Sequence, residues 1–330
     1  MLFVPSTLLF STTLVGGVLL CISSDSWFGA WCGLELNLMS FIPFLVMKGN
    51  QYSSEASLKY FLIQALGSSL VLLGALEFLM ISSSLYLVGF ALLLKMGAAP
   101  FHFWFPQVMN GISWFQCIAL ITIQKVAPMI LLEYLIVDSM FNFFVFWSAI
   151  MSAIVGALGG LNQTLLRKVM AFSSINHMSW MLFSILVSES AWLMYFVFYA
   201  VVSSSVIVLF SMQQLFHFVQ MFNFNNLNLS LISFLSVLSM GGLPPFTGFI
   251  PKWFIIQELS SQGLLFPLFV LLASALFTLY YYLRMGIVFF VLIKPNTGWF
   301  KNVNFKFNKL SLLVMVNFLG ILLPSLFMLF

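Results

Sequence analysis

Apolar segments of about 20 residues follow one another along this chain, separated by short polar connections. Segments of this length predict transmembrane helices, because the strands of a membrane barrel would alternate in hydrophobicity over about 10 residues. Hydrophobic residues make up 62% and charged residues 6% of the 330 positions, which is too few charges to cover the surface of a soluble protein. The fold class is therefore predicted to be an all-α polytopic membrane protein.

Hydropathy predicts about eleven transmembrane helices. They are expected at residues 3–22, 26–47, 56–81, 84–107, 112–135, 141–160, 166–187, 190–216, 227–259, 264–293 and 310–330. The ninth is too long for one straight helix, since at 1.5 Å per residue it would reach about 50 Å across a hydrocarbon core of about 30 Å. The sequence GGLPP at positions 241–245 therefore predicts two half-helices joined by irregular backbone.

The fourth predicted helix contains an interruption of the same kind. The stretch LLLKMGAAPFHFWFPQ, residues 92–107, is apolar but holds Lys95, a Gly-Ala-Ala-Pro sequence and a second proline, Pro106. Proline removes a backbone donor and clashes with the preceding turn, so the helix must break or kink here. Inside a bilayer, a break is tolerated only where other protein or a water-filled cavity satisfies the freed backbone groups. A charge beside a broken membrane helix is typical of an ion path.

The two interruptions resemble each other in sequence. PPFTGFIPK at 244–252 follows APFHFWFPQ at 99–107 at a constant offset, with matching proline spacing and a lysine at or near each break. The two helices are five crossings apart and so run in opposite directions. We therefore predict two five-helix inverted repeats, each with a broken helix, at residues 1–135 and 141–293, followed by a basic loop and a C-terminal helix at 294–330.

The charges in the connections predict the orientation. Even-numbered connections hold the basic residues Lys48, Lys59, Arg167, Lys168, Lys294, Lys301, Lys306 and Lys309, with Glu55 as their only acid. Odd-numbered ones hold only acids, at or near their ends: Asp25, Glu133, Asp138, Glu189 and Glu258. By the positive-inside rule, the N-terminus and the even connections face the cytoplasm or mitochondrial matrix, and the C-terminus faces the opposite side.

Four charged residues inside predicted helices are the candidate site: Glu35, Lys95, Lys125 and Lys252. Each central charge costs about 2.5–3.5 kcal/mol in a membrane helix, so each needs a reason. Burial disfavours the charged form and a nearby opposite charge restores it, so moving the partner switches such a group between holding and releasing a proton. A row of such groups, linked by water, would pass protons across the membrane.

Each candidate also has a purely structural alternative. Glu35 could be a hydrogen-bonded core carboxyl, Lys95 and Lys125 could form static pairs that fix helix packing, and Lys252 could be a lysine that reaches the interface from a half-helix end. Four other residues are undecided or weaker candidates for the proton relay. His177, in AFSSINHMSW, is either a relay member or a satisfied core histidine. Glu77 and Arg284 fit interfacial anchors better than relay members, and His102 is expected to hold the backbone of the first interruption. His217, in a connection, carries no hypothesis.

Several motifs, in this order and spacing, resemble one known family. WCGLELNLMSFIP, LLLKMGAAPFHFWFP, TIQKVAP, GLNQTLLRKVMAFSSINHMSW and GGLPPFTGFIPKW are similar to those of mitochondrial NADH dehydrogenase subunit 2. This family comprises antiporter-like membrane-arm subunits of respiratory complex I, here in the shortened animal form. The resemblance covers nearly the whole chain. It implies that Glu35 is the family's membrane glutamate, Lys95 its partner lysine, Lys125 the central relay lysine and Lys252 the lysine of the second broken helix.

The resemblance further implies an enzyme subunit without a redox centre of its own. Protons would be pumped by energy from NADH oxidation and ubiquinone reduction, with NADH, FMN, iron–sulfur clusters and ubiquinone all bound by other subunits and no cofactor or metal in this chain. The expected partners are other membrane-arm subunits and membrane lipid, with no nucleic acid and no small-molecule substrate other than protons. The expected location is the mitochondrial inner membrane, with the N-terminus in the matrix and the C-terminus in the intermembrane space.

Two other functions remain open at this point. The chain could be a stand-alone cation/proton antiporter, or a structural membrane subunit whose buried charges only fix helix packing. A stand-alone carrier should work when it is reconstituted alone, whereas a scaffold should tolerate the loss of Lys125 once assembly is confirmed.

Overall fold

The computed structural model describes residues 5–46, 50–77, 85–136, 139–223, 227–291 and 317. The chain divides into two compact units, residues 1–152 and 153–330. The first contains helices α1 (Pro5–Ser23), α2 (Trp27–Leu45), α3 (Gln51–Glu77), α4 (Leu85–Met96), α5 (Trp104–Gly111), α6 (Trp114–Ile121) and α7 (Ile123–Leu135), and α8 (Ser139–Leu161) crosses into the second. The second continues with α9 (Leu166–Val187), α10 (Glu189–Gln213), the short 3₁₀ helix η2 (Phe218–Asn223), α11 (Leu227–Gly241), α12 (Phe249–Ser261) and α13 (Leu265–Val291).

The helices agree with the hydropathy pattern. Within the described ranges, seven helical spans are long and apolar enough to cross a membrane, and α1, α4 and α11 supply shorter apolar helices. The first ten predicted segments each coincide with one helix or with a broken pair. The all-helical membrane fold is thereby confirmed. The eleventh segment, residues 310–330, lies outside the described residues except for Asn317, and the inverted repeat stays a prediction.

Both predicted interruptions are present. The first break, residues 97–103, separates α4 from α5, and the second break, residues 242–248, separates α11 from α12. Gly97 and Gly242 follow the ends of α4 and α11 with φ of 72° and 77°. This left-handed conformation is open to glycine at little cost and terminates helices readily. The glycine-proline signals in the sequence therefore end these helices where they were expected to.

The predicted fifth segment, 112–135, is present as one apolar span, Trp114–Leu135. It contains a one-residue interruption that was not predicted: α6 ends at Ile121 and α7 begins at Ile123. Thr122 between them has φ of −106° and ψ of −78°, and its hydroxyl donates a 2.7 Å hydrogen bond to the carbonyl of Ile118. A threonine that bonds back to the preceding turn bends a helix. The same span also contains Pro128, whose nitrogen cannot donate to the helix.

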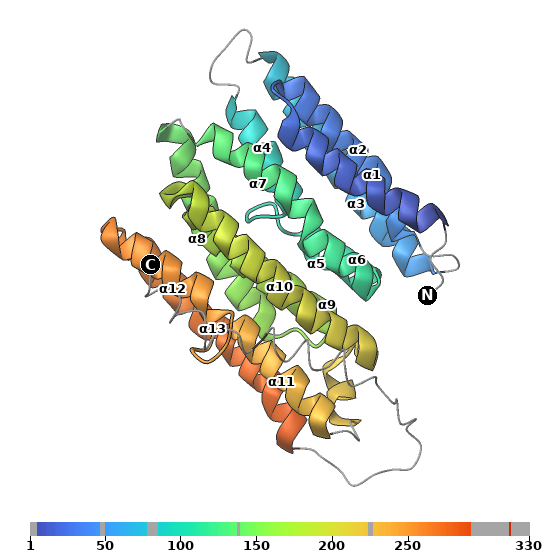
Figure 1. Cartoon of the computed structure of the whole chain (residues 1–330), viewed down its shortest axis with the longest axis vertical. Coiled ribbons are helices and arrows are strands. Elements are labelled where there is room, and N and C mark those ends of the chain that lie inside the picture. Colours follow the sequence, from blue (N-terminus) through green and yellow to red (C-terminus); the bar gives the residue numbers. More distant parts are fainter. Residues whose placement is uncertain are drawn as a thin grey trace. The chain divides into compact units, whose positions relative to one another are not determined.

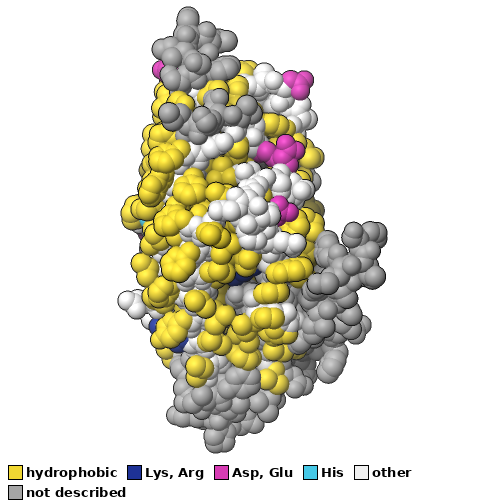
Figure 2. Space-filling view, turned by 90° about the vertical axis from the view of Figure 1, so that its left-hand side faces the viewer, with side chains coloured by type: hydrophobic (Ala, Val, Ile, Leu, Met, Phe, Trp, Pro, Cys, Tyr) yellow, Lys and Arg dark blue, Asp and Glu magenta, His cyan; other side chains and the backbone are white. Residues whose placement is uncertain are grey.

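The exposed and buried faces of helix α3 differ in the way expected of a helix that contacts lipid on one side. Most of its exposed large hydrophobic side chains are leucines, including Leu58, Leu62 and Leu66. Its buried face carries small and polar residues, among them Ser57, Tyr60, Gln64, Gly67 and Ser68. Small residues allow close approach of neighbouring helices in a membrane, and polar ones find partners only inside the bundle. Figure 2 shows one face of the molecule on which hydrophobic side chains dominate and charged ones are few.

In the first unit, α1, α2 and α3 lie side by side, and α1 packs closely on α2 (Figure 1). The close approach depends on two glycines. A Cβ on Gly17 would lie 2.8 Å from the backbone nitrogen of Asn37, and a Cβ on Gly33 would lie 2.6 Å from that of Cys21.

In the second unit, α9 is the central helix. Of the residues in its membrane-spanning stretch, 83% are buried, compared with 33% of those in α13.

The close contact between α1 and α2 gives a first testable prediction. Gly33→Ala should push α1 away from α2, because the added Cβ meets backbone atoms that no side-chain rotation can move. We expect a loss of about 1–3 kcal/mol of stability, measured by thermal unfolding in mild detergent. Gly16→Ala on α1 is the matched control, since nothing lies within 4 Å of a Cβ at that position. Equal unfolding temperatures for the two variants would contradict the prediction.

Candidate functional site

Several backbone carbonyls at the first break accept hydrogen bonds from the protein itself. The carbonyl of Leu94 accepts hydrogen bonds from the backbone of Gly97 and from the indole Nε1 of Trp104, each at 3.1 Å. The carbonyl of Lys95 accepts one from Nε2 of Gln64 on α3, also at 3.1 Å. For these two carbonyls, the partners come from the protein, which is one of the two ways in which a break is tolerated inside a bilayer. Trp104 and Gln64 were not recognised from sequence as the residues that do so.

Lys95 lies at the end of α4 and is 6% exposed. Its aliphatic chain passes against Gly67 of α3, where an added Cβ would lie 3.0 Å from Cγ and 3.3 Å from Cε of the lysine. Glu35, on α2 and half-buried, is close enough to interact with Lys95 electrostatically. The two groups are not within 4 Å of each other, and among the described residues the salt bridge found joins Lys59 and Glu55 at 2.6 Å. Glu35 and Lys95 are thus neighbours without a direct ion pair.

Lys125 is the most deeply buried of the candidate lysines, with 2% of its surface exposed. It lies in the first turn of α7, directly after the interruption at Thr122, whose carbonyl accepts a 3.1 Å hydrogen bond from the Lys125 backbone. Its ammonium nitrogen is 5.3 Å from the centre of the Phe105 ring. Phe105 belongs to α5, the half-helix after the first break. Lys125 therefore lies beside two interrupted segments.

Lys252 lies in the first turn of α12 and is 7% exposed. Its Nζ donates a 2.9 Å hydrogen bond to the carbonyl of Gly241, the last residue of α11. A Cβ on Gly242 would lie 2.9 Å from Cδ of the lysine, so its side chain runs directly over that glycine. The carbonyl end of a helix carries partial negative charge, which stabilises a cation placed there. Nζ is also 5.9 Å from the ring of Trp180 on α9.

Asn317 also contacts the second break. It is 1% exposed, its Oδ1 accepts a hydrogen bond from the Ser239 hydroxyl at 2.9 Å, and its carbonyl accepts one from the backbone of Thr247 at 3.2 Å. The sequence analysis missed this residue. The available signal was a single amide in the apolar run LLVMVNFLGILL, since a polar side chain inside a membrane segment needs a partner.

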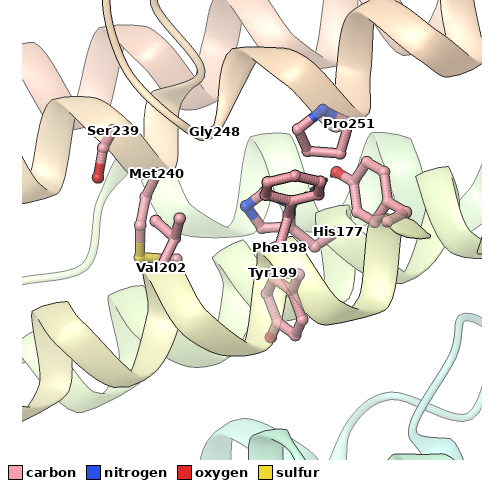
Figure 3. A pocket seen from close by; sticks show the side chains of 9 residues that line it. His177, Phe198, Tyr199, Val202, Ser239, Met240, Gly248 and Pro251 are labelled. Carbon is pink, nitrogen blue, oxygen red and sulfur yellow. Dashed lines mark hydrogen bonds between the residues drawn. The ribbon is translucent and has the colours of Figure 1, made fainter. Parts of the chain in front are cut away.

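His177 is part of a polar cluster in the second unit. Its Nδ1 lies 2.8 Å from the hydroxyl of Tyr195 on α10, and its ring centre is 4.8 Å from that of Tyr199. These residues, together with Ser239, Gly248 and Pro251 of the second-break region, line a cavity of about 10 Å³ (Figure 3). A cavity of this size holds about one water when polar groups line it. The structure thus places His177 beside the second break.

The weaker candidates differ in their burial. Glu77 is exposed at the end of α3, and half-buried Arg284 donates a 3.4 Å hydrogen bond to the carbonyl of Gln163 in the connection after α8. His102 is 8% exposed within the first break, and His217 pairs with Leu165 in an isolated β-bridge. The charged connection residues Lys48, Asp138, Lys294, Lys301, Lys306 and Lys309 lie outside the described residues.

The candidates fall into two groups. Glu35, Lys95 and Lys125 belong to the first unit, and His177 and Lys252 belong to the second. Within the described ranges, no cluster of three or more histidine, cysteine or acidic residues is arranged to hold a metal ion. Cys21, Cys32 and Cys117 form no disulfide with one another. The buried amines and the half-buried carboxyl are groups that can bind and release protons.

Comparison with known proteins gives consistent matches. A family model described as the transmembrane part of NADH:quinone oxidoreductase/Mrp antiporters matches residues 24–278. NADH-ubiquinone oxidoreductase chain 2 of Anopheles gambiae is 45% identical over 325 residues, which are 95% of this chain and 94% of that protein. The same protein of Aedes aegypti is 46% identical over 326 residues, again 95% and 94% of the two chains.

A solved structure shares the fold. A chain in the structure of respiratory complex I from Thermus thermophilus with bound Aureothin matches with a TM-score of 0.81 at 24% identity. The match covers 97% of this chain and 77% of that chain.

Proposed function

This chain belongs to the NADH-ubiquinone oxidoreductase chain 2 family, the antiporter-like membrane subunits of respiratory complex I, and we propose that it carries protons through the membrane arm of that complex. The observation that supports this most directly is shared by three residues. Lys95, Lys125 and Lys252 are each at least nine-tenths buried, and each lies in the turn beside an interrupted helix. Buried lysines at such positions are typical of ion paths.

The relay works by changing the charge around each lysine. In the first unit, Lys95 interacts electrostatically with Glu35 but makes no ion pair with it, so a movement of α2 relative to α4 changes the distance between the two groups and with it their interaction. Such a change biases Lys95 toward holding or releasing a proton. Lys125, beside the interruption at Thr122, is the next acceptor, and Lys252 serves the second unit.

The second unit supplies a position for water. The cavity between His177, Tyr195 and the second break has room for about one molecule, and His177 can both donate and accept a hydrogen bond. His177 is proposed as a relay member on this ground. The energy comes from NADH oxidation and ubiquinone reduction, and the cofactors for that chemistry are bound by other subunits.

The proposed setting follows from the family and the charges. The chain lies in the mitochondrial inner membrane among other membrane-arm subunits and lipid, with its N-terminus and basic connections in the matrix. The inverted-repeat organisation, with units at 1–135 and 141–293, is part of the same proposal. It supplies one broken helix to each half of the path.

Proton pumping by the assembled complex tests the function. The complex, purified in mild detergent and reconstituted in vesicles, should acidify one compartment when NADH and ubiquinone are added. Lys95→Met should lower the ratio of protons moved to electrons transferred, because methionine fills a similar volume but cannot bind a proton. Lys59→Met is the control, since Lys59 is exposed and paired on the surface with Glu55.

The alternatives give different results in the same assay. A stand-alone antiporter would exchange protons for sodium or potassium when this chain alone is placed in vesicles, which our proposal does not allow. A scaffold would keep a normal proton-to-electron ratio in fully assembled Lys95→Met complex. Either result would count against the proposed relay.

A further inference from the structure

A hydrogen-bonded chain of three side chains crosses the first unit beside the candidate lysines. The Tyr60 hydroxyl of α3 donates to Oε1 of Gln124 at 3.1 Å, and Nε2 of Gln124 donates to Oδ1 of Asn37 on α2 at 2.8 Å. Tyr60 is 2% exposed and Asn37 is 3% exposed. We call this chain the amide bridge. It joins residues that are far apart in the sequence, and it was not apparent from the sequence.

The position of Gln124 gives the bridge its importance. Gln124 directly precedes Lys125 and lies in the first turn of α7, just after the interruption at Thr122. Thr122 interrupts the regular helix between α6 and α7 for one residue, and directly after it Gln124 ties the first turn of α7 to α2 and α3. Successive residues on a helix point about 100° apart, so fixing the direction of Gln124 also fixes the direction of Lys125. With Gln124 held toward α2 and α3, Lys125 is directed to the ring of Phe105.

The bridge is attached to the same helices as the other proton-binding candidates of this unit. Asn37 is two residues after Glu35 on α2. Tyr60 is four residues before Gln64 on α3, so the two share a face, and Gln64 binds the carbonyl of Lys95. A shift of α2 or α3 is therefore transmitted to the first turn of α7 through two hydrogen bonds.

We propose that Gln124 is a positioning residue for the proton relay, holding the first turn of α7 to α2 and α3 so that Lys125 keeps its orientation next to the interruption. The inference rests on the proposed function of Lys125. Gln124 itself carries no proton in this proposal. Its role is to make the orientation of Lys125 depend on the helices that carry Glu35 and Gln64.

The test uses the assembled complex with Gln124→Leu, a residue of similar size that can make neither hydrogen bond. We expect NADH-driven proton pumping per assembled complex to fall about ten-fold, with the KM values for NADH and ubiquinone unchanged. A merely structural role would lower the amount of complex but leave turnover per complex intact. Gln51→Leu, at the exposed start of α3, is the matched control and should pump normally.

Two further variants keep the test decisive if Gln124→Leu assembles poorly. Tyr60→Phe removes only the donor to Gln124 and preserves the shape of the ring, and it should lower pumping less than Gln124→Leu. The double variant Asn37→Gln with Gln124→Asn exchanges the two amides and keeps the combined length of the contact between α2 and α7, whereas the contact with Tyr60 is not compensated. It should restore part of the activity that Gln124→Asn alone loses.

The outcomes separate the two proposals. Normal pumping per complex in Gln124→Leu and Tyr60→Phe, with pumping lost in Lys125→Met, would overturn the positioning role and leave the relay in place. Normal pumping in Lys125→Met would overturn both. Normal pumping in Tyr60→Phe, together with no recovery at all when Asn37→Gln is added to Gln124→Asn, would also overturn the positioning role, because neither hydrogen bond of the bridge would then affect Lys125.

Discussion

Replacing Lys125 with methionine is expected to remove most of the proton pumping of the assembled complex while leaving its assembly close to normal. Lys125 is 2% exposed and lies beside both the first break and the interruption at Thr122. Methionine fills a similar volume and removes the cost of burying an ammonium group away from water. A group that transfers protons contributes at least about 100-fold to a rate, so we expect a loss of ten-fold or more even if other routes remain. The measurement is the proton-to-electron ratio in reconstituted vesicles.

Two matched variants isolate the role of the exchangeable proton at Lys125. Lys59→Met removes a lysine that is exposed and paired with Glu55 on the surface, and it should pump normally. Lys125→Arg keeps the positive charge, but arginine does not release its proton in proteins, so this variant should be as inactive as Lys125→Met. Full activity of Lys125→Arg together with loss in Lys125→Met would assign a fixed charge, and not proton exchange, to this position. A normal proton-to-electron ratio in Lys125→Met would refute the relay.

The second large effect is expected from Gly248→Ala in the second break. A Cβ on Gly248 would lie 1.8 Å from the carbonyl oxygen of Ser239. The position of the added Cβ is fixed by the backbone of residue 248, and the oxygen belongs to the backbone of Ser239. No change of side-chain rotamer can therefore relieve the contact, and one side of the break must move. We expect a destabilisation of about 3 kcal/mol, at the upper end of overpacking effects. The amount of assembled complex on native gels should fall sharply.

Function should be affected together with assembly in this variant. Ser239 holds Asn317, and Gly242 lies under the side chain of Lys252, so a shift of this backbone disturbs the hydrogen bond from Lys252 to Gly241. The complex that does assemble should therefore pump less per molecule. Gly16→Ala, with open space around the new Cβ, is the control and should assemble as well as the native protein. Normal assembly and pumping of Gly248→Ala would show that the second break is not packed as described.

The sequence predicts the breaks well because their causes are local. Proline cannot donate a backbone hydrogen bond and glycine adopts positive φ, so Gly97, Pro100 and Gly242 with its following prolines end helices whatever surrounds them. The burial of Lys95, Lys125 and Lys252 is predictable for a related reason. A charge at the centre of an apolar span is stabilised inside the bundle and not against lipid.

The partners of the candidate residues could not be predicted, because they depend on contacts between distant segments. Gln64 binds the carbonyl of Lys95 across 31 positions of sequence, and Gln124 binds Asn37 across 87. Neither contact has a local pattern. The interruption at Thr122 was missed for a different reason. Threonine is compatible with a helix interior, and only its hydrogen bond to Ile118 reveals the bend.

The hydrogen bond between Lys252 and the end of α11 has a consequence for any cycle of protonation. An ammonium group has three N–H donors, and a neutral amine still has two, so the contact with the Gly241 carbonyl can persist in either charge state. What changes when the proton leaves is the attraction between the amine and the negative end of the helix. Gain or loss of a proton at Lys252 therefore changes the local electric field while the side chain stays hydrogen-bonded to Gly241.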